Sequence, residues 1–198
     1  LVNESIVHDK RIAEAGQANA SAILDLYIKI QDLLAAPDDP ASLSAQTAQL
    51  EKNLITAASR PDAPERLSTV VASARILANT FNEASDGLQK VRTTADRTIE
   101  LQVDQLNNAL LQVQELNAQI TKTQVQGNNS SGLLDLRQRV IDEISVLVPV
   151  RTVARENGQV AIYSTGGAVL LDSLAAEIGF ERSNLVTPYM SESAGRLS

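Results

Sequence analysis

The sequence contains no cysteine, no tryptophan and only one histidine. The absence of cysteine excludes disulfide scaffolds, thiolate zinc sites and thiol catalysis. A single histidine, His8, excludes any metal site that needs several imidazole ligands. A serine–histidine–aspartate set would depend on His8 near the chain end, and no other feature of the sequence supports one. We therefore expect no catalytic residues, no cofactor and no metal, and we predict that the protein is not an enzyme.

Aromatic residues make up only 3% of the chain, whereas hydrophobic residues make up 43%. A core of this composition consists of Leu, Ile, Val and Ala, which suits long helices better than sandwiches or deep ligand pockets. The net charge of −7, without any basic block, makes nucleic acid an unfavourable partner. No apolar run approaches the roughly 20 residues that span a bilayer, so we expect no membrane partner. Because the chain begins at Leu1 with no signal peptide, we interpret it as an excerpt of a longer protein.

Hydrophobic periodicity and proline positions predict helices that alternate with short breaks. Pro37 ends the first helix, and Pro40 opens the second in a favourable first-turn position. The third helix is interrupted only by Gly87 and would be roughly 90 Å long at about 1.5 Å per residue. Pro149 ends the fourth helix. The predicted helices cover about residues 4–36, 40–59, 64–126 and 133–147.

The third helix carries apolar residues in heptads, in two frames joined by a four-residue step between Ala95 and Ile99. Such a stutter locally unwinds a left-handed supercoil. Asn117 lies at a seam position of the second frame. A polar residue there would specify the register of helix packing at a cost in stability. We expect the stripe to pack against other helices of this chain, with a free coiled coil as the alternative. The predicted packing seam consists of Leu67, Val70, Ala74, Leu77, Phe81, Leu88, Val91, Ile99, Val103, Leu106, Leu110, Val113 and Ile120.

After Pro149 the hydrophobic period changes to two, which is typical of β-strands. Asn157 and Gly158 predict a hairpin turn with positive φ at Gly158. A third short strand is expected over residues 168–171. The predicted fold class is mainly α with a small β part (α+β), an elongated antiparallel helical bundle followed by a β-hairpin or short sheet. We place the helical domain at residues 1–149 and a β region at 150–198, as a hairpin region or as the start of a second β-rich domain.

Two polar features leave alternatives open. Arginines concentrate near the fourth helix and the hairpin. They form either a solvated or ion-paired face or a surface for an acidic partner. The glutamine-rich stretch 102–126 is either a solvated helix face or a polar interface between subunits. The arginines are Arg137, Arg139, Arg151 and Arg155.

Several segments, taken in order, carry a family resemblance. Residues 30–42 read IQDLLAAPDDPAS, residues 78–82 read ANTFN, and residues 113–120 read VQELNAQI. The sharpest segment is LLDLRQRVIDEIS, which contains Leu133, Leu134, Asp135 and Arg137. Together they resemble the bacterial flagellar hook-associated protein 1 family, the hook-filament junction proteins, with this chain as an internal core fragment.

The resemblance implies a structural, non-enzymatic protein of the bacterial flagellum that joins hook to filament. It implies an extracellular location reached by type III export without a cleaved signal peptide. Its implied partners are the hook protein, the second hook-associated protein and further copies of itself, with an export chaperone bound through the absent C-terminus. From the residues alone, a non-flagellar helical coiled-coil adaptor is the alternative. The adaptor should dimerise through the seam, whereas a junction core should cover the seam internally.

Overall fold

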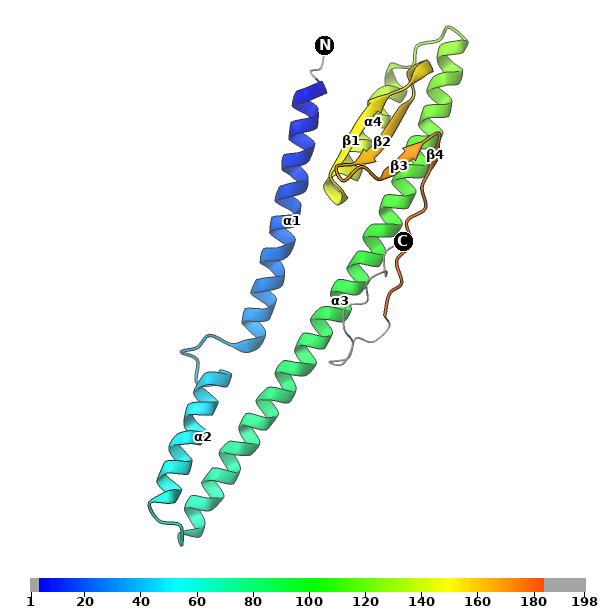
Figure 1. The fold of residues 1–198 in the computed structure, drawn as a ribbon. Coiled ribbons are helices and arrows are strands. Elements are labelled where there is room, and N and C mark those ends of the chain that lie inside the picture. Colours follow the sequence, from blue (N-terminus) through cyan, green and yellow to red (C-terminus); the bar gives the residue numbers. More distant parts are fainter. Residues whose placement is uncertain (1–3, 184–198) are drawn as a thin grey trace. The chain divides into compact units, whose positions relative to one another are not determined.

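The computed structural model describes residues 4–183 of the chain. Its helices are α1 (Glu4–Leu34), α2 (Leu43–Ala58), α3 (Pro64–Val125) and α4 (Ser131–Leu147). Four strands follow, β1 (Val150–Ala154), β2 (Val160–Ser164), β3 (Val169–Asp172) and β4 (Leu174–Ala175) (Figure 1). The predicted class, mainly α with a small antiparallel sheet, is confirmed. The part of the predicted β region beyond residue 183 lies outside the described residues.

The described residues form two compact units. One contains residues 4–23 and 97–182, and the other contains residues 24–96 with Ser183. Helices α1 and α3 each contribute to both units. This division differs from the boundary at 149/150 that the change of hydrophobic period suggested.

The second helix begins slightly later than the prolines indicated. Ser42 is its N-cap, and the Ser42 hydroxyl accepts the N–H of Ala45 at 3.2 Å. Asp39, the residue before Pro40, accepts the N–H of Ala41 at 2.7 Å within the preceding turn. Ser42, two residues after Pro40, therefore occupies the N-cap position.

The strands form one antiparallel sheet in the order β1-β2-β3-β4. The β1–β2 register pairs Val150 with Ser164 and Ala154 with Val160. The connecting segment contains a short 3-10 turn at Glu156–Gly158, where Asn157 and Gly158 have φ of 56° and 72°. Positive φ at both positions is the geometry that an Asn-Gly hairpin provides, because its twist matches that of the strands.

The hydrophobic core of the first unit joins the sheet to two helices. In Figure 1, β1 and β2 lie beside α4 and the C-terminal part of α3. The sheet therefore buries its apolar face against these helices, within the same unit. The buried cluster contains Leu106, Ala109, Leu110, Val113, Leu116, Val140, Ile141, Ile144, Val150, Val160, Ile162, Leu170 and Leu171.

Only part of the predicted α3 seam is buried. Leu106, Leu110, Val113 and Ile120 are buried, and Val103 is partly buried. The expectation of burial is wrong for Leu67, Ala74, Phe81, Leu88 and Ile99, which are all exposed.

In the second unit, the inward face of α3 combines Val and Leu side chains with two small residues. Val70, Leu77 and Val91 are partly buried there, and between them lie Ser73 and Gly87. Leu33 of α1 lies so close to Gly87 that a Cβ on this glycine would collide with it. Small side chains permit this close approach, so the larger Phe81, at 54% exposure, remains on the outer face.

Candidate interaction sites

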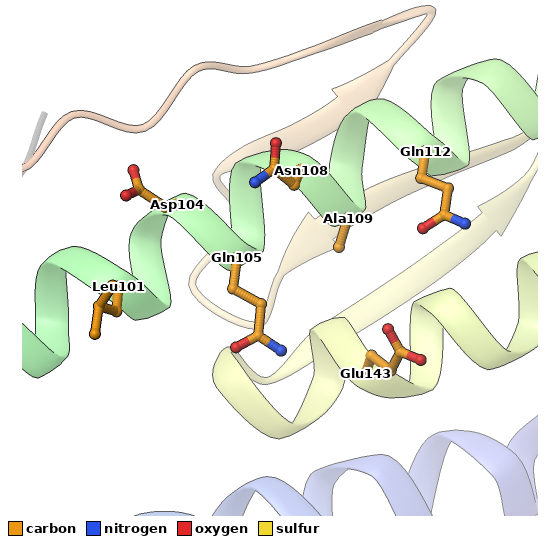
Figure 2. Close-up of a pocket in the computed structure, with 7 residues that line it drawn as sticks. All are labelled: Leu101, Asp104, Gln105, Asn108, Ala109, Gln112 and Glu143. Carbon is orange, nitrogen blue, oxygen red and sulfur yellow. The ribbon is translucent and has the colours of Figure 1, made fainter.

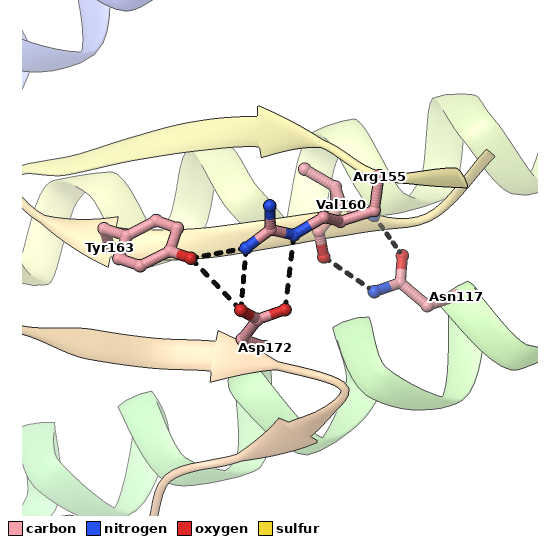
Figure 3. A network of polar contacts seen from close by, with 5 residues as sticks. All are labelled: Asn117, Arg155, Val160, Tyr163 and Asp172. Carbon is pink, nitrogen blue, oxygen red and sulfur yellow. Dashed lines mark hydrogen bonds and ion pairs between the residues drawn. The ribbon is translucent and has the colours of Figure 1, made fainter. Parts of the chain in front are cut away.

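Arg137 of α4 links α3 to the hairpin. Its Nη1 donates to Asn117 Oδ1 at 2.8 Å and to the carbonyl oxygen of Gly158 at 2.6 Å. Asn117 in turn donates Nδ2 to the carbonyl oxygen of Val160 at 2.8 Å (Figure 3). One guanidinium thus fixes a buried amide and the hairpin turn at once.

The surroundings of Arg137 explain its role. Burial lowers the pKa of Arg137, although a guanidinium remains charged at neutral pH. Leu133 of the same predicted motif packs against the core, Leu134 is partly buried and Asp135 is exposed. The partly buried Arg137 therefore binds amide and carbonyl oxygens of its own fold through Nη1.

A second polar group lies on the outer face of the sheet. Arg155 Nη2 donates to Asp172 Oδ2 at 2.7 Å and to the Tyr163 hydroxyl at 2.6 Å (Figure 3). The Tyr163 hydroxyl donates to Asp172 Oδ2 at 3.1 Å, and the Arg151 guanidinium lies 5.4 Å from the Tyr163 ring centre. The hydrogen bond from Arg155 lowers the pKa of Asp172, and Asp172 raises the pKa of Arg155. The cluster ties β1, β2 and β3 together from the solvent side.

Amide side chains of α3 also hold the segment that follows β3. Asn107 donates Nδ2 to the carbonyl oxygen of Ile178 at 2.8 Å and accepts the Ile178 N–H at 3.0 Å. Gln114 Oε1 accepts the N–H of Ala175 at 2.6 Å. The segment therefore runs antiparallel to α3 and is attached through its backbone. Asn107 and Gln114 were not among the predicted site residues, although amides seven residues apart on a helix were a visible signal.

A buried ion pair attaches the start of α1 to α4. Arg11 is only 4% exposed, and its Nε donates to Asp142 Oδ1 at 2.8 Å. Its Nη2 is buried without a hydrogen-bond partner among residues 4–183. No local sequence pattern indicates this pair, because its members are 131 residues apart.

A polar pocket opens between α3 and α4, with a volume of about 410 Å³. Figure 2 shows Gln105 and Gln112 extending from α3 toward α4, and Glu143 extending from α4 toward α3. The pocket lining consists of Leu101, Asp104, Gln105, Asn108, Ala109, Gln112 and Glu143.

The described residues contain no group of three or more His, Asp or Glu side chains able to hold a metal ion. His8 lies partly exposed on α1. Within the same range, no helix is long and apolar enough to cross a membrane. Asn107, Gln114 and Asn117 instead bond backbone groups of this fold.

Comparison with known proteins identifies the family. Residues 27–191 match the family described as the flagellar hook-associated protein FlgK helical domain. The chain belongs to this family. Its segments resembling hook-associated protein 1 are therefore explained by common descent of a FlgK helical domain.

Several curated relatives share the description "Flagellar hook-associated protein 1". The Bacillus subtilis protein is 30% identical over 107 residues, which cover 54% of this chain and 21% of the relative. The Escherichia coli protein is 25% identical over 173 residues, which cover 86% of this chain and 31% of the relative. The Salmonella typhimurium protein is 25% identical over 200 residues, which cover 97% of this chain and 36% of the relative. The chain thus spans about a third or less of these FlgK relatives.

A solved structure supports the fold. The flagellar hook junction protein FlgK from Burkholderia pseudomallei superimposes with a TM-score of 0.79 at 20% identity. The match covers 86% of this chain and 30% of that protein. The arrangement of helices and sheet is therefore a FlgK helical-domain fold.

Proposed function

We propose that this chain is a structural domain of a protein that joins the flagellar hook to the filament. Membership in the FlgK helical-domain family is the observation that carries the proposal. The interior chemistry agrees with it, because Arg137, Asn117 and Asn107 are used to fix helices and strands to one another. The protein acts as a mechanical connector and not as an enzyme.

The proposal extends to location and partners. The protein leaves the cell by flagellar type III export, without a cleaved signal peptide, and resides at the hook-filament junction. There it contacts the hook protein, the second hook-associated protein and other copies of itself. An export chaperone binds through a C-terminal part of the protein beyond this chain. These statements rest on the family and on the likeness to the curated hook-associated proteins.

The alternative, a non-flagellar helical adaptor, is best tested by location. Leu67 and Phe81 are 48% and 54% exposed, so association through α3 is open to both candidates. Oligomeric state therefore does not distinguish them, contrary to the expectation of an internally covered seam. Only the connector must sit outside the cell at a defined place on the flagellum.

Immunogold electron microscopy with antibodies against this chain tests the proposal. We expect label confined to the hook-filament boundary on intact cells and detached flagella. A strain deleted for the gene serves as the control for antibody specificity. Label inside permeabilised cells with unlabelled flagella would overturn the connector function and favour the adaptor.

A further inference from the structure

Helix α3 holds extended backbone on one face by a simple geometric match. Asn107 and Gln114 are seven residues apart, which is about 10.5 Å along a helix. Their backbone partners Ile178 and Ala175 are three residues apart, about 10 Å along an extended chain. Every seventh helix residue can therefore bond every third residue of an extended segment.

A second set of amides with the same spacing lines the pocket between α3 and α4. Gln105 and Gln112 are also seven residues apart, with Asn108 between them (Figure 2). None of these three side chains has a hydrogen-bond partner among residues 4–183. Amides can both donate and accept, so they are suited to a backbone N–H and C=O.

The charge of this pocket selects among possible segments. Its lining contains the carboxylates of Glu143 and Asp104 and no basic residue. Neither carboxylate forms an ion pair within the described part of the chain, whereas the adjacent Asp142 is already paired with Arg11. A cationic side chain entering beside Glu143 would meet an unpaired carboxylate.

We propose that this pocket is a docking groove for an extended segment of another polypeptide that carries a lysine or arginine. Gln105, Asn108 and Gln112 hold the backbone of the segment, as Asn107 and Gln114 hold residues 175–178 on the other face. Glu143 receives the basic side chain. The groove is a binding site whatever the location of the whole protein, so this proposal stands independently of the flagellar one.

Photo-cross-linking of the full-length protein in the cells that produce it tests the groove. p-Benzoylphenylalanine replaces Asn108, and mass spectrometry maps the attached peptide after irradiation. The same group at Tyr163, which lies beneath Arg151, is the control for photochemistry, with an adduct inside the chain. We expect the Asn108 adduct to be a peptide of another polypeptide with a lysine or arginine within about three residues of the attachment point.

Charge exchange then tests the selectivity. Glu143→Lys should lower the adduct yield on the order of tenfold, and replacing the mapped basic residue with Glu should restore it. Asp135→Lys on the exposed side of the same helix should leave the yield unchanged. The proposal is overturned if Asn108 gives no adduct while Tyr163 does, if the mapped peptide has no basic residue, or if Glu143→Lys leaves the yield unchanged.

Discussion

Asn117 satisfies both backbone polar groups of Val160. Its Nδ2 donates to the Val160 carbonyl oxygen at 2.8 Å, and its Oδ1 accepts the Val160 N–H at 3.2 Å. The same Oδ1 accepts from Arg137. A polar residue in a helical seam thus determines how the hairpin sits on the helix.

Asn117→Ala should destabilise the protein strongly. The substitution leaves Val160 without its side-chain partner and removes an acceptor from the half-buried Arg137. We expect a loss of about 2–4 kcal/mol in the free energy of unfolding, measured with urea. Asn108→Ala, on the same helix but without a partner among the described residues, is the matched control and should cost less than about 0.5 kcal/mol. Equal losses for both variants would contradict the role of Asn117.

Two truncations on α3 should differ in their cost. Leu110 is fully buried, whereas Phe81 is 54% exposed. Leu110→Ala should cost about 2–5 kcal/mol through lost burial and a cavity. Phe81→Ala should stay within about 1 kcal/mol despite the larger side chain removed. The two variants are compared by the midpoints of their guanidinium chloride denaturation curves. A large shift of the midpoint for Phe81→Ala would show that this face of α3 is covered.

Gly158→Ala should destabilise the hairpin for two separable reasons. The φ of 72° is costly for alanine, and its Cβ would lie 2.7 Å from Gln124 Oε1. We expect a loss of about 1–2 kcal/mol in thermal unfolding. Adding Gln124→Ala should recover only the stability lost through the steric clash, because the backbone strain at position 158 remains. Complete recovery in the double variant would contradict the contribution of the backbone.

Gly87→Ala tests the contact with Leu33. Alanine in a helix interior is favoured over glycine by about 1 kcal/mol, yet here its Cβ would collide with Leu33. We expect Gly87→Ala to destabilise the wild-type chain and to stabilise a Leu33→Ala background. A double-mutant cycle measured by chemical denaturation gives the coupling. Stabilisation in both backgrounds would exclude the close approach.

The pair of Arg155 and Asp172 predicts a pH dependence in the acid range. Since Arg155 lowers the pKa of Asp172 below its unfolded value of about 3.9, the unfolded state takes up this proton first. The stabilisation is present above about pH 4 and is lost as pH falls through the lower folded-state pKa. Denaturation of wild-type and Asp172→Asn proteins should therefore give curves that converge toward pH 2. A constant difference from pH 7 to pH 2 would contradict the interaction.

The local elements were predictable from the sequence because periodicity, prolines and the Asn157-Gly158 pair are local signals. The inward face of α3 was not predictable in the second unit. A pattern of large apolar residues favoured Phe81 as interior, but burial depends on the neighbour, and Leu33 packs where Gly87 leaves room. The family motif indicated Arg137, but its acceptors on Asn117 and Gly158 required the tertiary arrangement. Partnerships across long separations, such as Arg11 with Asp142, have no local signature.

The backbone bonds that Asn107 and Gln114 make to residues 175–178 have a mechanical consequence. The segment lies antiparallel to α3, so a pull along the helix axis loads its bonds to Asn107 and Gln114 together, in shear. A pull perpendicular to the axis would instead open them one after another. The attachment should therefore resist tension along α3 more than peeling away from it, and the resistance depends little on which side chains the segment carries.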